Sequence, residues 1–444
     1  MWNLTKAARL RIRHGEGTAR SSRELWLAER SAYIDESMAD ALQVQCCIAG
    51  GGPAGMMLGY LLGRAGVRTV VLEKHADFLR DFRGDTVHPS TLMIMQELGL
   101  IEEFLKLPHS KIRALSAEIG DTRVKIADFA HIPAPYRFVA LMPQWDFLNF
   151  LAKKGRRFPA LTIMMSAPVV SLIEDAGRVV GVKAATLGGS IDIRAQLVVG
   201  CDGRSSTVRA ASGLVVQDLG SPIDVLWFRL SKRAADPGQV LGRLGVDKMI
   251  VTIDRTDYWQ CAYVIGKGGI GRVHAAGLEA FKAAVAAGAR FLSDRVDELT
   301  SFDDVKLLSV SVDRLTKWSK PGLLCIGDAA HAMSPVGGVG INLAIQDAVA
   351  TANLLSAKLK AGTLRDGDLE GVRRRRLFPV KVIQGLQVAV HNRVLKPTVS
   401  GDRRTLRVPW PLKVLDAVPW LRRWPAQFLG LGVRPEHVRS PDCP

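Results

Sequence analysis

Short apolar runs of strand length alternate with longer segments of helical period along most of this chain. Residues 44–49 form the first uncharged run, and within residues 56–65 three leucines recur on one side of a helix. A second apolar run covers residues 69–72. Strand, helix and strand in this order predict a βαβ unit.

The same alternation continues along the chain, with a change of character in the middle. It predicts further helices at residues 89–98, 144–152 and 378–394, and further strands at residues 162–170, 179–185, 197–199 and 323–326. Residues 225–230 and 258–265 are rich in aromatic side chains, which is typical of a second, more antiparallel sheet. Residues 112–139 alternate weakly around two prolines, as edge strands or a connection over a pocket would. We therefore expect an α/β protein whose second domain is α+β.

Three glycines follow the first strand at G-x-G-x-x-G spacing. Gly50 permits a tight turn, Gly52 lets the backbone approach a pyrophosphate, and Gly55 lets the helix pack close to the strand. The helix N-terminus presents N–H groups and a positive dipole end to phosphates. Glu73 ends the second strand, where a carboxylate can accept hydrogen bonds from ribose hydroxyls. We predict a dinucleotide site here rather than an ordinary glycine-rich loop.

An acidic turn follows the predicted strand at residues 197–199. Asp202 and Gly203 come directly after this strand, and Ser205 or Ser206 can cap the helix that follows. Open α/β sheets bind ligands at the carboxyl ends of their strands. Asp202 is therefore a candidate ligand residue, with an ordinary strand-to-helix turn as the alternative.

A second acidic turn, Gly327 and Asp328, opens a loop that is nearly free of side chains. The residues that give the loop this character are Pro335, Gly337, Gly338 and Gly340. Asn342 then opens a long apolar helix. A backbone-lined loop that feeds a helix N-terminus suits an anionic or flat ligand that needs N–H donors. His331 could be catalytic, but we expect it to pack or to bond locally.

Two further patterns look like functional motifs but lack the neighbouring elements that such motifs need. Gly266, Gly268 and Gly271 repeat the glycine spacing, but a lysine occupies the turn and no second strand ending in an acid follows. We expect a loop of the second domain, with the next helix beginning near Leu278, rather than a separate nicotinamide-nucleotide domain. The four arginines at residues 373–376 are expected to form a solvated helix face.

Charge and cysteine usage narrow the choice of partners and compartment. The 444 residues include 60 Lys and Arg against 43 Asp and Glu, a net charge of +17, which favours nucleotide phosphates, a membrane surface or nucleic acid. None of the recurring nucleic-acid motifs is present, so we expect no nucleic-acid partner. Six cysteines without C-x-x-C spacing predict reduced thiols, a cytoplasmic location and no metal site. Six glycines and Pro53 interrupt the longest uncharged stretch, so we expect no transmembrane helix.

Both ends of the chain lie outside the alternating pattern. Residues 1–41 are rich in arginine and contain no apolar core of signal-peptide length. We interpret them as an appendage or a start-site artefact, with a surface-binding helix or an organelle presequence as alternatives. The tail beyond Lys396 combines prolines with an aromatic and basic set, Trp410, Trp420, Trp424, Arg422 and Arg423. We expect an irregular cap packed on the body, with a peripheral membrane contact as the alternative.

The three landmarks together resemble one family. The GGGPAG turn with Glu73, the CDG of residues 201–203 and the GD of residues 327–328 look like the fingerprints of the class A flavoprotein monooxygenases. This is the p-hydroxybenzoate hydroxylase-like family, and the resemblance runs from about residue 42 to about residue 394. It implies a Rossmann-like FAD-binding domain interrupted by a mostly antiparallel-sheet substrate domain, with a helical C-terminal part.

The resemblance and the pattern together divide the chain into segments. Residues 1–41 are an extension outside the fold, and residues 396–444 are a C-terminal cap or tail. The FAD-binding domain would take residues 42–110, 141–214 and 306–395, and the substrate domain would take residues 111–140 and 215–305.

The resemblance also implies where FAD lies. The pyrophosphate would lie on the glycines of the first turn, the adenosine ribose on Glu73, and the flavin ring along the loop before Asn342. The cofactor-binding residues that it implies are Gly50, Gly52, Pro53, Ala54, Gly55, Glu73, Lys74, Arg83, Gln144, Asp202, Gly203, Gly327, Asp328, Pro335, Gly338, Gly340, Ile341 and Asn342. No side chain is named as a catalyst; the backbone beside the flavin ring would serve instead, at Pro335, Gly337, Gly338 and Gly340.

The implied activity is that of an FAD monooxygenase. NAD(P)H, a transient cosubstrate, would reduce the flavin, and O2 would be captured as a C4a-hydroperoxide that hydroxylates a small, electron-rich, often aromatic substrate. An FAD-dependent reductase or dehydrogenase is the first alternative, because the same motifs bind FAD whatever the chemistry. A non-catalytic flavin-binding protein at a membrane surface is the second. The choice between NADH and NADPH and the oligomeric state stay open at this level.

Overall fold

The computed structural model describes residues 42–79, 86–120, 122–236, 242–245, 248–255, 257–399 and 408–443. Apart from Leu42, these residues belong to the compact unit Gln43–Pro444. The predictions for residues 1–41 and for Arg83 fall outside the described residues.

An eight-stranded sheet forms the framework of the first landmark region. Its path is β19-β20-β11-β1-β2-β8, and β10 and β9 branch from β11 as an antiparallel pair. The strands are β1 (Leu42–Ala49), β2 (Thr69–Leu72), β8 (Leu161–Met164), β9 (Val169–Asp175), β10 (Arg178–Thr186), β11 (Gly189–Gly200), β19 (Ser319–Lys320) and β20 (Leu323–Cys325). The pairs β1–β2, β2–β8 and β11–β20 are parallel.

The carboxyl ends of four of these strands meet at one edge of the sheet. Backbone hydrogen bonds join the residues that follow them: Gly50 N–H to Leu72 O, Cys201 N–H to Ala49 O and Ile326 N–H to Gly200 O. The three sequence landmarks are therefore neighbours in space, as the rule for open α/β sheets requires.

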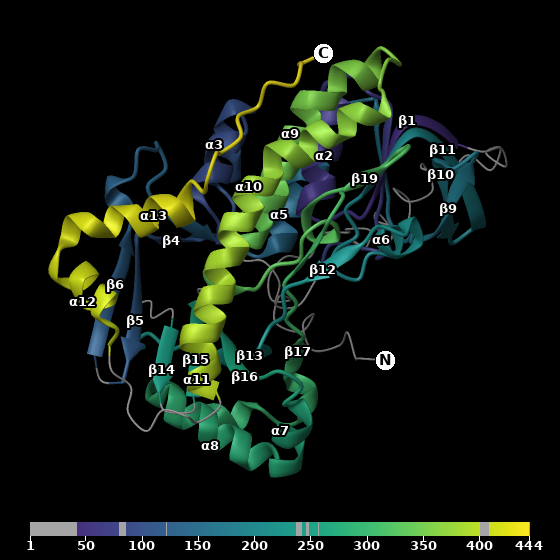
Figure 1. Cartoon of the computed structure of the whole chain (residues 1–444). Coiled ribbons are helices and arrows are strands. Elements are labelled where there is room, and N and C mark those ends of the chain that lie inside the picture. The colour runs from purple at the N-terminus through teal and green to yellow at the C-terminus, as the bar shows by residue number, and fades with distance from the viewer. Residues whose placement is uncertain are drawn as a thin grey trace, which may run out of the picture. The chain divides into compact units, whose positions relative to one another are not determined.

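Long helices pack on this sheet (Figure 1). Helix α2 (Pro53–Arg64) contacts α5 (Gln144–Gly155) and α9 (Gly340–Lys360), and α10 (Asp366–Val390) packs along α9. The apolar side chains of α2 are buried, as their spacing predicted. Gly59 lets α2 lie against the sheet, because a Cβ there would approach Val71 to 2.6 Å.

A second sheet of seven strands is mostly antiparallel. Its order is β17-β13-β16-β15-β14-β5-β6, and only β5 and β14 are parallel neighbours among the pairs described. The strands are β5 (Ala114–Ile119), β6 (Thr122–Asp128), β13 (Ile223–Ser231), β14 (Gly242–Gly245), β15 (Lys248–Asp254), β16 (Tyr258–Gly266) and β17 (Lys306–Leu308). Their aromatic and β-branched residues had indicated such a sheet.

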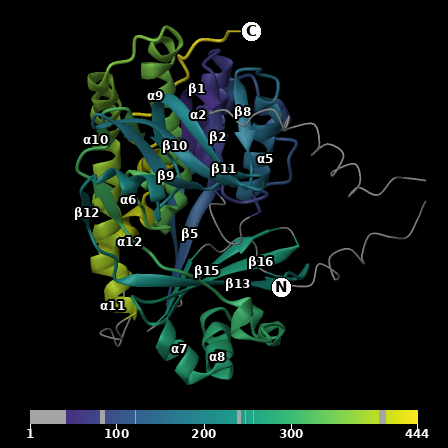
Figure 2. The same cartoon turned by 90° about the vertical axis from the view of Figure 1, so that its right-hand side faces the viewer.

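The two faces of this second sheet bury different partners. Leu226 and Phe228 of β13 pack with Phe281 of α8 (Leu278–Gly288), so one face is covered by helices. Figure 2 shows α7 (Ile270–Ala276) and α8 together beneath the sheet. Val225 and Trp227 alternate with the first pair and lie on the other face.

Two small sheets and several short helices complete the described chain. The remaining elements are β3 (Thr86–Val87), β4 (Ser110–Ile112), β7 (Val139–Leu141), β12 (Val216–Asp218), β18 (Asp313–Leu315), α3 (Pro89–Glu97), α4 (Ile101–Phe104), α6 (Thr207–Ser212), α11 (Lys396–Val399), α12 (Trp410–Ala417) and α13 (Arg423–Gly430). β3 and β4 flank β7, and β12 pairs with β18. None of the described helices is both long and apolar enough to cross a membrane.

The predicted α/β fold class is confirmed, and several boundaries differ from the predictions. The run at residues 162–170 is divided between β8 and β9, because Ser166 adopts a left-handed φ of 55° between them. A helix follows the second glycine repeat at once, since α7 begins at Ile270 rather than near Leu278. β16 of that repeat is antiparallel to both its neighbours, so the repeat is no βαβ unit.

Candidate functional site

The turn after β1 has two positions where only glycine fits. Gly50 has φ of +103°, and a Cβ there would lie 2.5 Å from the carbonyl oxygen of Cys201. A Cβ on Gly55 would lie 1.9 Å from the carbonyl oxygen of Gly50. These two glycines therefore shape the turn and hold α2 against the strand.

Gly52 has a different environment, because a Cβ there would meet no protein atom within 4 Å. It is the N-cap of α2 and has no side-chain hydrogen bond to the helix, and Pro53 follows it. The open space in front of an uncapped helix N-terminus could receive an anionic group. The turn thus fits the pyrophosphate of a dinucleotide.

Glu73 closes the same turn from the end of β2. Its side chain is 7 % exposed, Oε2 accepts the Gly51 N–H at 2.9 Å, and Oε1 accepts the His75 N–H at 3.1 Å. A carboxylate is an acceptor with about four lone-pair positions, which suits hydroxyl donors. Glu73 lines a cavity in front of the turn and could hold a ribose.

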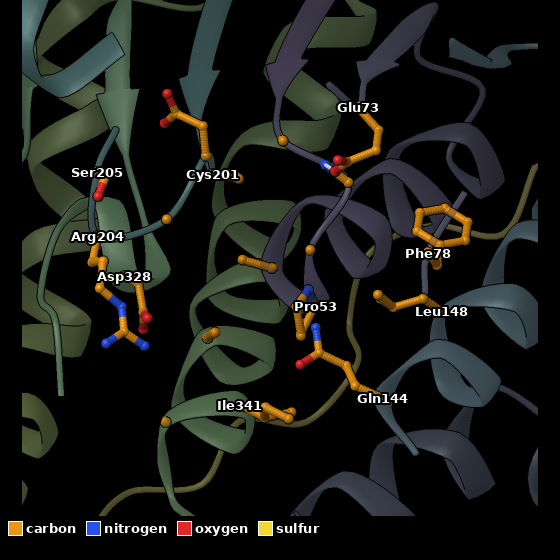
Figure 3. Close-up of a pocket in the computed structure, with 18 of the residues that line it drawn as sticks. Pro53, Glu73, Phe78, Gln144, Leu148, Cys201, Arg204, Ser205, Asp328 and Ile341 are labelled. Atoms are coloured by element: carbon orange, nitrogen blue, oxygen red, sulfur yellow. Dashed lines mark hydrogen bonds between the residues drawn. The ribbon is translucent and has the colours of Figure 1, made fainter. Parts of the chain in front are cut away.

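This cavity has a volume of about 370 Å³ and joins the two sheets. Of the sequence-predicted cofactor residues, those that line it are Gly50, Gly52, Pro53, Ala54, Glu73, Lys74, Gln144, Asp202, Gly203, Asp328, Pro335, Gly338, Gly340 and Ile341. Figure 3 shows the Gln144 amide directed toward Pro53, while Asp328 extends from the opposite side. Residues nearly 300 positions apart in the sequence therefore share one cavity.

Three predicted cofactor residues that the structure describes do not line the cavity and have structural roles instead. Gly55 lies behind the turn, and Gly327, with φ of +59°, packs against Ala54 and Ala344. Asn342 is 4 % exposed, and its side-chain oxygen accepts the His88 N–H at 2.9 Å. Its amide nitrogen donates to two backbone carbonyls, so this side chain fixes the loop rather than pointing into the cavity.

Asp202 lies at the cavity wall, but its carboxylate is engaged by the protein. Oδ1 accepts the Ser206 hydroxyl at 2.5 Å and Oδ2 accepts the Val208 N–H at 3.1 Å. Ser206, rather than Ser205, caps α6 by accepting the Arg209 N–H. The Asp202 side chain thus orders the start of α6, and its backbone faces the cavity next to the Gly50 turn.

The glycine-rich loop is held from both sides. Gly337 and Gly338 have φ of 82° and 61°, and α9 begins at Gly340, two residues before the predicted start. The Thr86 hydroxyl donates to the Gly338 carbonyl at 2.7 Å. On the other side, the Ser334 N–H donates to Gln387 Oε1 at 3.1 Å. The loop therefore presents a fixed backbone to the cavity.

His331 lies in a buried ionic network behind this loop rather than in the cavity lining. Its Nε2 lies 2.6 Å from Oδ2 of Asp347, and Asp347 Oδ1 accepts Arg376 Nε at 2.9 Å. Burial works to raise the pKa of Asp347, but His331 and Arg376 hold that pKa below its ordinary range. The expectation of local bonding for His331 agrees with this geometry.

Arg376 corrects the expectation that residues 373–376 form a solvated face. It is 1 % exposed, because α10 turns it inward against α9. The sequence does not show which of the four consecutive arginines points inward, because Asp347, the partner of Arg376, is 29 positions away.

Part of the cavity lining is apolar. Trp227 of β13, Ile253 of β15, Leu308 of β17 and Met333 contribute to this part. The sequence pattern predicted a strand at residues 225–230 but assigned none of these four residues to a site. Side chains alternate between the two faces of each strand, but which face meets the cavity depends on how the two sheets pack.

Comparisons with known proteins agree with this geometry. Residues 43–382 match a family model described as an FAD binding domain. The 6-methylpretetramide 4-monooxygenase of Streptomyces rimosus is 33 % identical over 343 residues, 76 % of this chain and 81 % of that protein. The para-nitrophenol 4-monooxygenase of Pseudomonas sp. (strain WBC-3) is 25 % identical, over 74 % of this chain and 82 % of that protein. Three further monooxygenase or synthase relatives are longer, and the chain spans 61 % to 63 % of them.

The fold also matches solved structures. The OxyS anhydrotetracycline hydroxylase from Streptomyces rimosus superimposes with a TM-score of 0.69 at 24 % identity, covering 89 % of this chain and 77 % of that one. The family match spans the Gly50 turn, Glu73, Asp202 and Asp328, which surround one cavity. The chain therefore belongs to the FAD-binding-domain family and is an FAD-dependent monooxygenase.

Proposed function

We propose that this monooxygenase hydroxylates a small phenolic or otherwise electron-rich aromatic compound bound at the apolar part of the cavity. The observation that carries the proposal is the continuity of the cavity from Glu73 to Trp227. One part of the lining has the donors and the carboxylate that an adenine dinucleotide needs, and another part is an aromatic and aliphatic wall. Relatives named for 6-methylpretetramide and para-nitrophenol support an aromatic substrate class.

The residues of the first part would hold FAD along the cavity. Gly52 and the N-terminus of α2 would bind the pyrophosphate, Glu73 the ribose, and Asp328 the chain between pyrophosphate and ring. Bound FAD supplies the redox chemistry, in which NAD(P)H provides the electrons and O2 provides the inserted oxygen atom.

The glycine-rich loop would act through its backbone. Its positive-φ glycines bring peptide groups to the cavity without side chains in between, and Thr86 and Gln387 hold them in place. Preorganised N–H groups stabilise negative charge that develops during a reaction. The apolar wall around Trp227 would exclude water from the reacting atoms, which limits wasteful release of peroxide.

The two sheets would have different roles, one in FAD binding and the other in substrate binding. We assign FAD binding to residues 42–110, 141–214 and 306–395 and the substrate wall to residues 111–140 and 215–305, although β17 at 306–308 pairs within the second sheet. A cytoplasmic location is supported by the six free cysteines, five of them buried.

Purified protein loaded with FAD tests the proposal. Oxidation of NADH or NADPH should accelerate with a matching phenol, consume O2 and yield product that carries one oxygen atom from 18O2. A control without substrate measures basal oxidation and the peroxide it releases. Equal substrate turnover without O2 would instead establish a reductase or dehydrogenase.

A further inference from the structure

The C-terminal segment exposes its tryptophans although it is packed on the body of the protein. Trp410, Trp420 and Trp424 are 76 %, 58 % and 57 % exposed, and Val414 between them is 40 % exposed. Large apolar side chains gathered on one surface are uncommon in a monomer and mark a contact site.

Helical spacing groups these exposed residues into two sets, on elements that contact each other. In α12, Trp410, Lys413 and Val414 follow the i, i+3, i+4 rule, and Trp420 of the 3-10 helix Pro419–Arg422 has the same spacing to Arg423 and Trp424 at the start of α13. We call these six residues the tryptophan face. Leu412 and Leu415 lie on the other side of α12 and are half-buried.

The opposite side of this segment is firmly attached. Asp416 of α12 accepts the backbone N–H of Lys125 on the edge strand β6 at 3.1 Å. Within the segment, Arg422 donates to the Leu415 carbonyl at 2.8 Å. Ala426 of α13 is fully buried, and a Cβ on Gly430 would press on Phe129 at 3.2 Å. Helices α12 and α13 border β6 (Figure 1). The opposite side of the segment therefore packs on the body of the protein, and the tryptophan face stays exposed.

The charge on the tryptophan face is positive and lies among the rings. The Arg423 guanidinium is 5.4 Å from the centroids of both Trp420 and Trp424. Residues 408–430 contain Lys413, Arg422 and Arg423 against the single carboxylate Asp416. Tryptophan with arginine or lysine is the combination that binds the headgroup region of an anionic bilayer.

From this exposure, spacing and charge we propose that the tryptophan face docks the protein on an anionic lipid surface. A second copy of the chain fits less well, because a self-complementary contact would bring the same cations together. The far end of α13 reaches the glycine-rich loop, since the Leu429 carbonyl accepts from Nδ1 of His88. If the proposed function holds, an apolar aromatic substrate would collect in the same surface.

Co-sedimentation of the full-length, FAD-loaded protein with lipid vesicles tests this docking, without any substrate. Wild-type protein should bind vesicles of phosphatidylcholine with phosphatidylglycerol, bind pure phosphatidylcholine at least tenfold less, and lose affinity as salt rises. The triple variant W410A/W420A/W424A should lose at least tenfold in affinity for the anionic vesicles. Arg423→Glu should weaken binding several-fold.

Matched controls separate docking from folding and from total charge. Leu187→Ala removes another exposed apolar side chain, 85 % exposed in the β10–β11 turn, and should leave binding unchanged. Arg194→Glu changes the net charge equally at an exposed site on β11 and should weaken binding less than Arg423→Glu. Each variant should keep the FAD absorbance and thermal midpoint of the wild type.

Three results overturn the proposal. Wild-type protein could fail to bind either vesicle, or the triple variant could bind like the wild type, which assigns the lipid contact to another part of the chain. The third result is a wild-type protein that binds no vesicles and is a dimer by size-exclusion chromatography with light scattering, while the triple variant is a monomer. None of these results bears on turnover, so the proposed hydroxylation would stand or fall separately.

Discussion

The carboxylate of Asp347 bridges His331 and the backbone of Gly327. Its Oδ2 lies 2.6 Å from His331 Nε2 and accepts the Gly327 N–H at 3.1 Å, while Oδ1 accepts Arg376 Nε. Gly327 directly precedes Asp328 at the cavity wall. The network therefore ties α9 and α10 to the turn that carries a predicted cofactor contact, without any of its side chains entering the cavity.

Replacing Asp347 by asparagine should destabilise the protein strongly. The change removes the 2.9 Å carboxylate partner of Arg376 and leaves this buried arginine, as a charged partner, only Glu436 at the longer distance of 3.4 Å; breaking a buried pair typically costs about 3 to 5 kcal/mol. Urea unfolding at pH 7, followed by far-UV circular dichroism, measures it. Asp192→Asn is the matched control, because the Lys183–Asp192 pair is largely exposed and should contribute less than about 1 kcal/mol. Equal losses in the two variants would contradict the network's role.

Gly52→Ala should separate cofactor binding from folding. A Cβ at this position meets no protein atom, so stability without FAD should stay within about 0.5 kcal/mol of wild type. The methyl group would instead occupy the space where a pyrophosphate approaches, and FAD affinity should fall at least about tenfold, or about 1.4 kcal/mol. Flavin fluorescence titration of the apoprotein measures the Kd.

Two other glycines provide the controls for this experiment. Gly271 is the third glycine of the second repeat, and a Cβ there would likewise meet no atom within 4 Å, so Gly271→Ala should leave FAD affinity unchanged. Gly55→Ala should destabilise the apoprotein itself, because its Cβ would clash with the Gly50 carbonyl. A Gly52→Ala protein with wild-type FAD affinity would move the pyrophosphate away from this turn.

Local sequence signals predicted the first βαβ unit and its glycine turn well. The strand at 69–72 agrees with β2, and the glycines lie where their spacing indicated, because each signal depends on residues within one βαβ unit. The ends of strands also came together at one edge, since parallel strands must align their carboxyl ends.

Features that depend on packing between distant elements were not predictable in this way. Arg376 is buried because α9 supplies Asp347, and Asn342 turns inward because Thr86, Thr91 and His88 offer partners there. Trp227 belongs to the cavity because of the way the second sheet meets the first. In each case the residue type permits either outcome, and only the tertiary partner decides.

His88 should make stability pH-dependent below neutrality. Burial lowers the pKa of His88 to about 4, although its hydrogen bond to the Leu429 carbonyl acts in the other direction. The unfolded chain, with a histidine pKa near ~6.5, therefore binds more protons between pH 6.5 and 4. Its contribution is complete above about pH 6.5 and is lost progressively as pH falls toward 4.

The variant His88→Gln cannot titrate, so it should lose less stability on acidification. Between pH 7 and pH 5 the difference should be about 2 kcal/mol, because each pKa unit corresponds to about 1.4 kcal/mol. Urea unfolding of wild type and variant at both pH values measures it. His274→Gln, at an exposed position in α7, should retain the wild-type pH dependence. An unchanged dependence in His88→Gln would exclude His88 as the source.

Trp227→Ala should weaken substrate binding and leave FAD binding intact. Trp227 lines the cavity from β13 of the second sheet, whereas the dinucleotide turn belongs to the first sheet, so the change removes an aromatic wall without altering that turn. Loss of one aromatic contact is worth about 1.5 kcal/mol, and KM for the best stimulating phenol should rise about tenfold. The opened wall should also admit water, so peroxide released per NAD(P)H oxidised should increase. Trp424→Ala, exposed on α13, is the control and should change neither value in the absence of vesicles. Unchanged KM and coupling in Trp227→Ala would place the substrate elsewhere along the cavity.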